Sequence, residues 1–263
     1  MTATFKGKNI YYSKQGSGAK TIVLVHGYPQ NGIVFDKQVA FLQQHFTVLV
    51  PDLPGAGQSE YNEALTTIDD FADAVNAVIE KENINECYLF GHSMGGYITL
   101  AFAEKYPDKL KGFGLIHSHA LADDEEKIEG RKKTIQSLKQ YGSEPFVKTM
   151  VPGLFTEANQ TKLKTEIDTL IDHFKTITKE AVIRFTEIMI SRPDRTGVLK
   201  NAHVPVLFIL GEEDNSAKLD VVLPQTHLAD ETFIKIFSDV AHMGMIEEPD
   251  GVNETILDFV GDD

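Results

Sequence analysis

The sequence predicts an α/β fold in which a mostly parallel sheet is flanked by helices. Short apolar runs rich in β-branched residues recur along the chain, which is typical of strands buried on both faces of a parallel sheet. Helical patterns separate these runs, so strands and helices alternate. The alternation stops between about residues 121 and 200, where only helical patterns occur. We therefore expect a helical cap inserted into one α/β domain.

The first strands are predicted near the N-terminus. Residues 4–13 alternate loosely and end near the glycines of 16–18, which indicates an edge hairpin strand and its turn. Residues 21–25 are continuously apolar, and 46–50 form a second buried strand. A helix over 35–44 connects these two strands.

The later elements follow the same alternation. A short apolar strand ends at Phe90, and further strands are expected at 112–116, 205–210 and 232–237. Core helices are expected from Asp69, from Met94 and from Pro249, and cap helices at 123–141, 145–151, 163–174 and 179–191. We thus divide the chain into a core domain of residues 1–120 and 201–263 and a helical cap insertion of residues 121–200.

Ser93 lies in a G-x-S-x-G pentapeptide, Gly91 to Gly95, between an apolar strand and an apolar-periodic helix. A serine at a sharp strand-to-helix turn is the arrangement of a nucleophile elbow, where small neighbours leave room and the hydroxyl points clear of the sheet. The pattern also fits a serine N-cap at any strand-to-helix junction. The rest of the chain decides between these interpretations.

Ser93, Asp214 and His242 are the expected catalytic residues. A serine hydroxyl needs a base within hydrogen-bond reach, and an imidazole base needs a carboxylate on its other nitrogen. Loops at the carboxyl ends of parallel strands share one edge of the sheet, so residues distant in sequence meet there. The three residues follow the chain order nucleophile, acid, base. We expect Ser93 to attack, His242 to carry the proton and Asp214 to orient the imidazole.

Other residues compete for two of these roles. Among nine histidines, His119 is the second candidate for the base and could line the pocket. His26 is expected to brace a neighbouring loop by hydrogen bonding. For the acid, Asp214 is preferred because its short side chain at the far end of the turn can reach an imidazole from the neighbouring loop, although spacing alone does not exclude Glu213. Further acidic candidates are Glu212, Asp123 and Asp124.

Attack on an ester creates an oxyanion, and donors directed at it are often the largest contribution to catalysis. The backbone N–H of Met94, directly after the nucleophile, is expected to supply one donor. The backbone N–H of Tyr28 is expected to supply the second, since Gly27 permits a close approach. Gly27 and His119 are the expected substrate-binding positions.

Composition limits the possible functions. The chain has 263 residues and a formal net charge of −14, from 25 basic and 39 acidic residues, which excludes broad attraction to nucleic acid or anionic membranes. No apolar run is long enough to cross a bilayer. Cys87 is the only cysteine, so no intramolecular disulfide or cysteine metal cluster can form. We expect a cytoplasmic monomer or homodimer with no metal and no cofactor, whose partners are a small ester substrate and water.

Taken together, these motifs resemble the α/β-hydrolase fold superfamily. The matching pieces are His26 to Pro29, Asp52 to Ser59, Gly91 to Gly96, Gly211 to Asp214 and His242. The resemblance implies a mostly parallel eight-stranded sheet, a helical cap over the site and hydrolysis through an acyl-enzyme. It also favours Asp214 over Glu213, because the position of Asp214 matches the acid of the superfamily.

Within this superfamily, Ser93 argues against epoxide hydrolases and haloalkane dehalogenases, which have aspartate there. Residues 122–133, acidic at first and then basic, are similar to the cap of carboxylesterases and 3-oxoadipate enol-lactonases. Arg184 and Arg192 either meet a substrate carboxylate or form surface salt bridges. We expect a carboxylic ester hydrolase; the alternatives are an enol-lactonase, a carbon–carbon bond hydrolase, a proline iminopeptidase and a ligand sensor with slow turnover.

Overall fold

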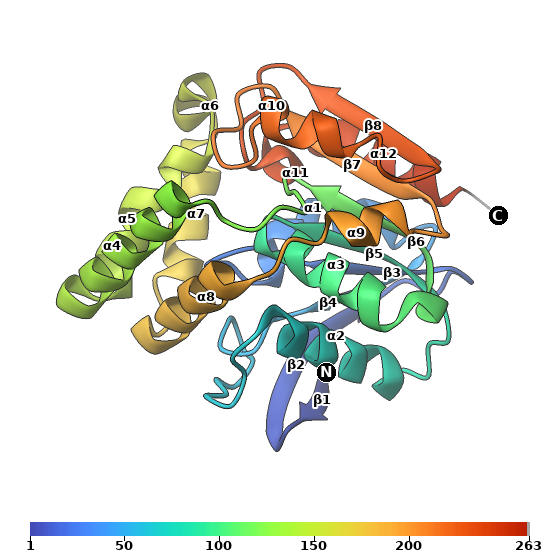
Figure 1. The fold of residues 1–263 in the computed structure, drawn as a ribbon, viewed down its shortest axis with the longest axis horizontal. Helices are drawn as coiled ribbons and strands as arrows, with labels where there is room; N and C mark the ends of the chain where they lie inside the picture. Colours follow the sequence, from blue (N-terminus) through green and yellow to red (C-terminus); the bar gives the residue numbers. More distant parts are fainter. Residues whose placement is uncertain (262–263) are drawn as a thin grey trace.

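An eight-stranded sheet forms the centre of the molecule in the computed structural model, which describes residues 1–261 (Figure 1). The strand order is β1-β2-β4-β3-β5-β6-β7-β8. The strands are β1 (Thr2–Phe5), β2 (Lys8–Gln15), β3 (Thr21–Val25), β4 (Thr47–Pro51), β5 (Cys87–His92), β6 (Leu110–Ile116), β7 (Val206–Gly211) and β8 (Thr232–Phe237). β1 and β2 pair antiparallel with their neighbours, whereas all pairs from β4 to β8 are parallel. The predicted mostly parallel, eight-stranded sheet is confirmed.

The N-terminal hairpin differs from the prediction. Instead of one strand over residues 4–13, β1 and β2 are joined by a tight turn at Lys6 and Gly7. Both turn residues have positive φ, 46° and 77°. Two-residue hairpin turns that match the twist of the strands need positive φ at both positions, and Lys-Gly is a weaker signal for them than Asn-Gly. The hairpin turn therefore comes earlier in the chain than the glycines at 16–18.

Helices cover both faces of the sheet. The core helices and short 3-10 turns are η1 (Gly32–Phe35), α1 (Asp36–Leu42), α2 (Ile68–Lys81), α3 (Met94–Lys105), η2 (Pro107–Lys109), α10 (Leu219–Val222), η4 (Leu223–Gln225), α11 (Gly244–Glu247) and α12 (Pro249–Val260). Successive residues of a strand face opposite sides of a sheet. In β5, the Phe90 ring contacts Phe259 of α12 at 5.7 Å between centroids, while the next residue, Gly91, faces Thr99 of α3. α3 and α12 consequently lie on opposite faces.

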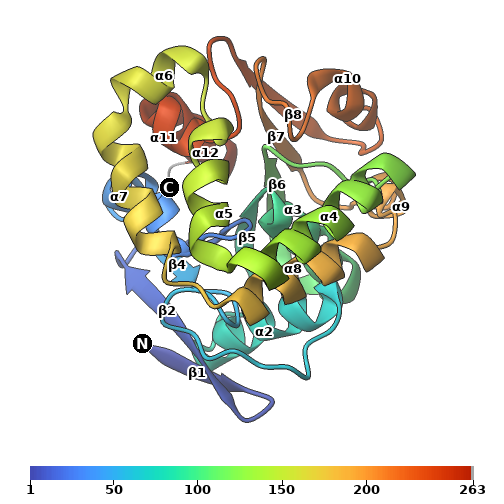
Figure 2. The same ribbon diagram turned by 90° about the vertical axis from the view of Figure 1, so that its left-hand side faces the viewer.

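Only helices occur between β6 and β7 in the part of the chain that the structure describes. They are α4 (Glu125–Tyr141), α5 (Ser143–Met150), η3 (Pro152–Leu154), α6 (Glu157–Lys162), α7 (Lys164–Phe174), α8 (Lys179–Ser191) and α9 (Thr196–Lys200). α4 to α8 gather on one side of the molecule (Figures 1 and 2). We call residues 121–200 the cap segment. Its division from the core as a separate insertion stays a prediction.

None of the helices within residues 1–261 combines the length and the apolar character needed to cross a bilayer.

Candidate active site

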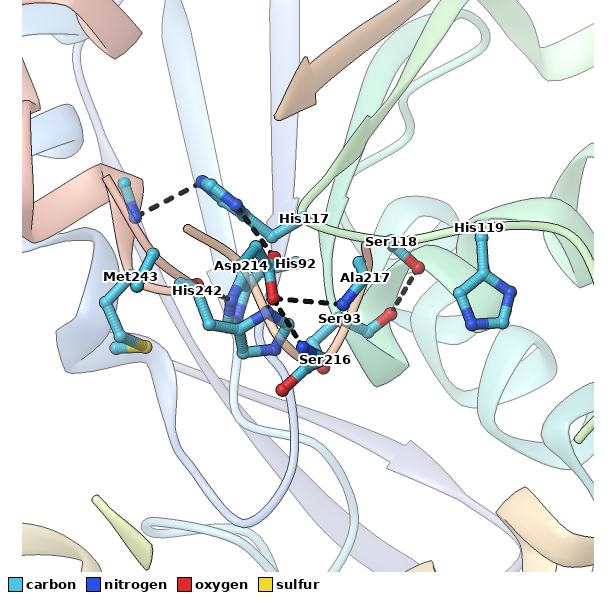
Figure 3. Close-up of polar contacts among 12 residues, drawn as sticks. His92, Ser93, His117, Ser118, His119, Asp214, Ser216, Ala217, His242 and Met243 are labelled. Carbon is cyan, nitrogen blue, oxygen red and sulfur yellow. Dashed lines mark hydrogen bonds and ion pairs between the residues drawn. The ribbon is translucent and has the colours of Figure 1, made fainter. Parts of the chain in front are cut away.

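Ser93 lies at the turn between β5 and α3 and has a strained backbone, with φ 53° and ψ −117°. Such a conformation costs about 1–3 kcal/mol in a residue other than glycine, and it persists only where the surroundings hold it. The N–H of Ser93 donates to the Ile116 carbonyl at 3.0 Å. The carbonyl of Ser93 accepts from Gly96 N–H at 2.8 Å and from the Ser118 hydroxyl at 2.7 Å (Figure 3). The turn is therefore held on both sides by hydrogen bonds.

The glycines after Ser93 let α3 approach the sheet closely. A Cβ on Gly95 would lie 2.1 Å from the carbonyl oxygen of Val25 in β3, and a Cβ on Gly96 would lie 2.3 Å from Ser118 Oγ. Both distances are far below van der Waals contact, so neither position has room for a side chain. The G-x-S-x-G pattern thus has a steric cause at this turn, and the structure favours the elbow over a simple N-cap, since Ser93 makes no side-chain cap hydrogen bond.

Asp214 and His242 come together at the carboxyl end of the sheet. His242 Nδ1 donates to Asp214 Oδ2 at 2.8 Å (Figure 3). The other carboxylate oxygen, Oδ1, accepts from the backbone N–H groups of Ser216 at 2.7 Å and Ala217 at 2.9 Å. Asp214 is 3% exposed, whereas Glu213 beside it is exposed to solvent. The geometry therefore separates two acids that the sequence spacing alone does not.

His117 is a second imidazole on the same carboxylate, a contact that the sequence pattern did not predict. Its Nδ1 donates to Asp214 Oδ2 at 3.1 Å, and its Nε2 accepts from Gly244 N–H at 3.2 Å. These two partners fix the tautomer of His117 with the proton on Nδ1. The close approach also requires glycine at 244, because a Cβ there would lie 2.3 Å from His117 Nε2.

The charge state of Asp214 follows from these contacts. Burial alone raises the pKa of a carboxyl group, but the charge of His242 and the hydrogen bonds from His117 and His242 outweigh it and hold the pKa of Asp214 well below its ordinary value. Asp214 is thus a carboxylate at neutral pH. It can stabilise positive charge on the His242 imidazole.

His117, Asp214 and His242 also place ligand atoms within 4.8 Å of one another, as a metal site would. The nitrogen-to-oxygen distances of 3.1 and 2.8 Å are those of direct hydrogen bonds. A tetrahedral zinc ion about 2.0–2.1 Å from each ligand would hold neighbouring ligand atoms about 3.4 Å apart. We therefore interpret the cluster as hydrogen-bonded and assign no metal ligands.

Two backbone N–H groups are open beside Ser93. No hydrogen bond within residues 1–261 uses the N–H of Tyr28 or that of Met94. Gly27 brings the Tyr28 loop against the elbow: a Cβ at 27 would lie 3.0 Å from Ser93 Cβ and 2.8 Å from His92 Nδ1. Gly27 therefore acts by allowing this approach and offers no side chain to a substrate.

Two buried histidines hold the loops around Ser93. His26 Nδ1 donates to the Gly27 carbonyl at 2.9 Å, and its Nε2 accepts from Leu53 N–H at 2.9 Å, which ties the loop after β3 to the loop after β4. His92 Nε2 contacts the carbonyl oxygen of His242 at 2.9 Å and positions its backbone. Burial lowers the pKa of His26 and, more strongly, that of His92, so both are neutral.

Ser93 and His242 line one cavity of about 450 Å³, whose wall also includes residues of α4 and α5. Within residues 1–261 no hydrogen bond joins the Ser93 hydroxyl to the His242 imidazole; catalytic hydrogen bonds in ligand-free structures are often long and tighten when substrate binds. His119, an expected substrate contact, is not among the lining side chains. It is buried behind Tyr97, with its Nε2 3.4 Å from the Tyr97 hydroxyl.

Glu247 in α11 anchors the loop that carries His242. Its Oε2 accepts from the N–H groups of Ala241 at 3.0 Å and Met243 at 3.2 Å. Its Oε1 accepts from Thr156 N–H at 2.9 Å in the cap segment. The sequence pattern did not single out Glu247, because these contacts depend on the fold of the His242 loop and on Thr156, which lies 91 residues away in the chain.

The two arginines considered for a substrate carboxylate are already paired. Arg184 forms an ion pair with Glu187 at 3.3 Å. Arg192 is 5% exposed, pairs with the buried Asp123 at 2.9 Å and lies over the Tyr97 ring. The expected surface salt bridge of Arg192 is therefore a buried one.

Comparisons with known proteins support the fold. The family described as alpha/beta hydrolase fold matches residues 20–145. The chain is similar to a pimeloyl-[acyl-carrier protein] methyl ester esterase of Pectobacterium carotovorum, at 26% identity over 95% of this chain and 98% of that protein. A thermophilic esterase from Thermogutta terrifontis, solved with malate bound, has a TM-score of 0.93 at 25% identity and covers 99% of this chain and 97% of its own. The enol-lactonase from Burkholderia xenovorans LB400 has a TM-score of 0.91 at 24% identity, with 99% of both chains covered, and shows likeness of fold.

Proposed function

The chain belongs to the α/β-hydrolase fold superfamily, and on that premise we propose that it is a serine hydrolase that cleaves carboxylic esters of small to medium size. One observation carries the proposal: a strained serine and an aspartate-bound imidazole line the same cavity, beside two open backbone N–H groups. These are the parts that acyl transfer needs.

Each residue has a distinct task in this mechanism. Ser93 Oγ attacks the ester carbonyl carbon while its proton passes to His242 Nε2. The carbonyl oxygen becomes an oxyanion, which the N–H groups of Tyr28 and Met94 stabilise. The tetrahedral intermediate then breaks its bond to the alcohol oxygen, which takes the proton from His242 and leaves. Ser93 remains acylated.

Water completes the reaction. It attacks the acyl-enzyme as His242 accepts one of its protons, and a second oxyanion forms in the same place. This intermediate collapses, the bond to Ser93 Oγ breaks, and the serine recovers its proton from His242. Asp214 stays ionised throughout because its four hydrogen-bond donors and its low pKa disfavour protonation.

The choice of ester over other acyl compounds is supported by two relatives. The protein from Pectobacterium carotovorum is named a methyl ester esterase, and the one from Thermogutta terrifontis an esterase. The cavity of about 450 Å³ suits a substrate of small to medium size. Lactones, amides and carbon–carbon bonds place the same demands on the serine and the imidazole, so a substrate panel has to separate them.

Substitution of the nucleophile tests the proposal. Ser93→Ala should abolish hydrolysis of p-nitrophenyl butyrate while the melting temperature changes little, because the Ser93 side chain makes no cap hydrogen bond. A fluorophosphonate should label the wild-type protein at Ser93 and leave the variant unlabelled. Turnover by the variant at the wild-type rate would refute the mechanism. A burst of one product per protein followed by a stall would instead indicate a ligand sensor.

A further inference from the structure

Lys127 lies on the wall of the active-site cavity and forms no ion pair with a carboxylate of residues 1–261. It lies in the first turn of α4, is half-buried and lines the same cavity as Ser93. Its Nζ makes one weak contact, 3.4 Å to the carbonyl oxygen of Ser216, and no carboxylate of residues 1–261 lies within 4.0 Å of it. Burial lowers the pKa of Lys127, which shows that its surroundings disfavour the charge. A charged side chain that is partly buried is usually paired with a group of opposite charge.

Arg131 lies one helical turn further along α4 and lines the cavity with Lys127. Residues four apart share one face of a helix, so the two like charges repel. Arg131 pairs with Asp123 through Nε and Nη2, and its Nη1 makes no hydrogen bond in the described chain. Asp123 also pairs with Arg192. One buried carboxylate thus serves two guanidinium groups.

The local charge balance is therefore positive. In the part of the chain that the structure describes, Asp123 is the one carboxylate that forms an ion pair with any of the cations Lys127, Arg131 and Arg192. Asp124 also precedes Lys127 in the chain, but it is exposed and caps α4 by accepting from the backbone N–H of Lys127. The neighbouring His119 is neutral, because burial and then Lys127 lower its pKa to about 3.

The rest of the cavity wall contrasts with these cations. No acidic side chain of residues 1–261 lines the cavity, and α5 and its neighbours contribute apolar side chains, among them Phe146, Met150 and Leu154. The protein as a whole carries a net charge of −14. A cationic patch inside an apolar wall of an acidic protein favours a ligand with an apolar body and one anionic end.

We infer that the cavity selects esters that carry a carboxylate at some distance from the scissile bond, held by Lys127 and Arg131 while the ester carbonyl lies at Ser93. The inference rests on the proposed esterase function. Arg131 Nη1 and the free Nζ donors of Lys127 supply charge-assisted hydrogen bonds to the carboxylate oxygens. The chemistry requires no further group, since the bonds made and broken are those of ordinary ester hydrolysis.

Two matched substrate pairs test this selectivity and show which half of the ester bears the charge. Mono-p-nitrophenyl glutarate and p-nitrophenyl valerate differ by a carboxylate in place of a methyl group at the end of the acyl chain. 4-Acetoxybenzoate and its methyl ester differ by a carboxylate on the alcohol half. We expect kcat/KM to be at least tenfold higher for the anionic member of one pair, and this preference should shrink as salt screens the charges.

Lys127→Met should lower kcat/KM for the preferred anionic ester at least tenfold more than for its neutral partner. Lys127→Glu should lower it further, because the like charge repels the carboxylate. Lys133→Met is the matched control, as Lys133 is an exposed lysine on the same helix, and it should leave both members of the pair unchanged. Equal rates within both pairs, or equal losses for the two members in Lys127→Met, would overturn the inference.

A binding measurement separates this inference from the esterase proposal. Valerate, which has an apolar body and one anionic end, should raise the melting temperature of the wild-type protein more than its neutral amide, valeramide, does, and Lys127→Met should remove the difference. This readout needs no turnover. A protein that binds valerate through Lys127 but hydrolyses no ester would refute the esterase function and keep the anion site. Ester hydrolysis without any preference for the anionic substrate would refute the anion site and keep the esterase function.

Discussion

Asp214→Asn should lower kcat by about 10⁴-fold, because one amide cannot replace the four contacts of the carboxylate. Asp214 accepts two backbone N–H groups on Oδ1 and two imidazole N–H groups on Oδ2. Asparagine offers one acceptor oxygen and one NH₂ donor. The backbone N–H groups cannot lose their protons, so the amide oxygen should stay with them and the NH₂ group should face His117 and His242.

The effect of Asp214→Asn on the two histidines determines the size of the expected loss in kcat. His242 can accept from the NH₂ group only if its own proton moves to Nε2, the atom that must receive the proton of Ser93. His117 cannot change in this way, since its Nε2 already accepts from Gly244 N–H at 3.2 Å. A wrong tautomer of the base costs about 10⁴-fold in kcat, equivalent to about 5.5 kcal/mol at 1.36 kcal/mol per factor of ten. The unpaired donor at His117 should also cost about 1–3 kcal/mol of stability.

The assay is kcat for p-nitrophenyl butyrate, measured with the melting temperature of each variant. Glu213→Gln is the matched control, because Glu213 is the exposed acid next to Asp214 that fits the same sequence spacing. We expect the control to retain full activity. A loss of less than tenfold in Asp214→Asn, or an equal loss in Glu213→Gln, would refute the assignment of Asp214.

Three further substitutions test other parts of the site. Gly27→Ala should lower kcat about 10²-fold, because the new Cβ would lie 3.0 Å from Ser93 Cβ and displace one oxyanion donor; an unchanged kcat would contradict this. Glu247→Gln should lower the melting temperature by about 5–10 °C and reduce kcat. The NH₂ group of the glutamine would face backbone N–H donors that bind the carboxylate oxygens of Glu247 in the wild-type protein. An unchanged melting curve would argue against the role of Glu247 in anchoring the His242 loop. His119→Gln should make the protein less sensitive to acid. The pKa of His119 is about 3 in the folded protein and about 6.5 in the unfolded chain, so the contribution of His119 to the free energy of unfolding is full above pH 6.5 and falls by roughly 2–3 kcal/mol by pH 4.5. Melting curves recorded from pH 7 to 4.5 should therefore decline less steeply in this variant, and parallel declines would contradict the reasoning.

The sequence predicted the regular part of the fold well because the buried strands leave a strong pattern. The run at 21–25 became β3 with the same bounds, and the cap helix at 179–191 became α8. Short helices such as α6 and α11 were missed, since one or two turns carry too few apolar positions to show a period. The hairpin turn at Lys6 and Gly7 was missed because its composition is an uncommon one for this geometry.

Sequence motifs predicted only part of the candidate site. Ser93, Asp214 and His242 each follow a recognisable strand. Ser93 and His242 line one cavity and Asp214 accepts a hydrogen bond from His242, whereas their catalytic roles stay predictions. His117 was missed although it follows β6, because the contact with Asp214 depends on β6 and β7 being neighbours, and strand order cannot be read from local patterns. Glu247 was missed for a similar reason.

The links between the cap segment and the His242 loop limit how this protein can open. The His242 N–H donates to the carbonyl of Leu154 at 2.9 Å, and Glu247 joins Thr156 to the residues on either side of His242. A movement of residues 154–156 away from the sheet would therefore displace His242, which accepts the proton of Ser93 in the proposed mechanism. A competent catalytic centre therefore requires residues 154–156 of the cap segment to stay docked against the His242 loop.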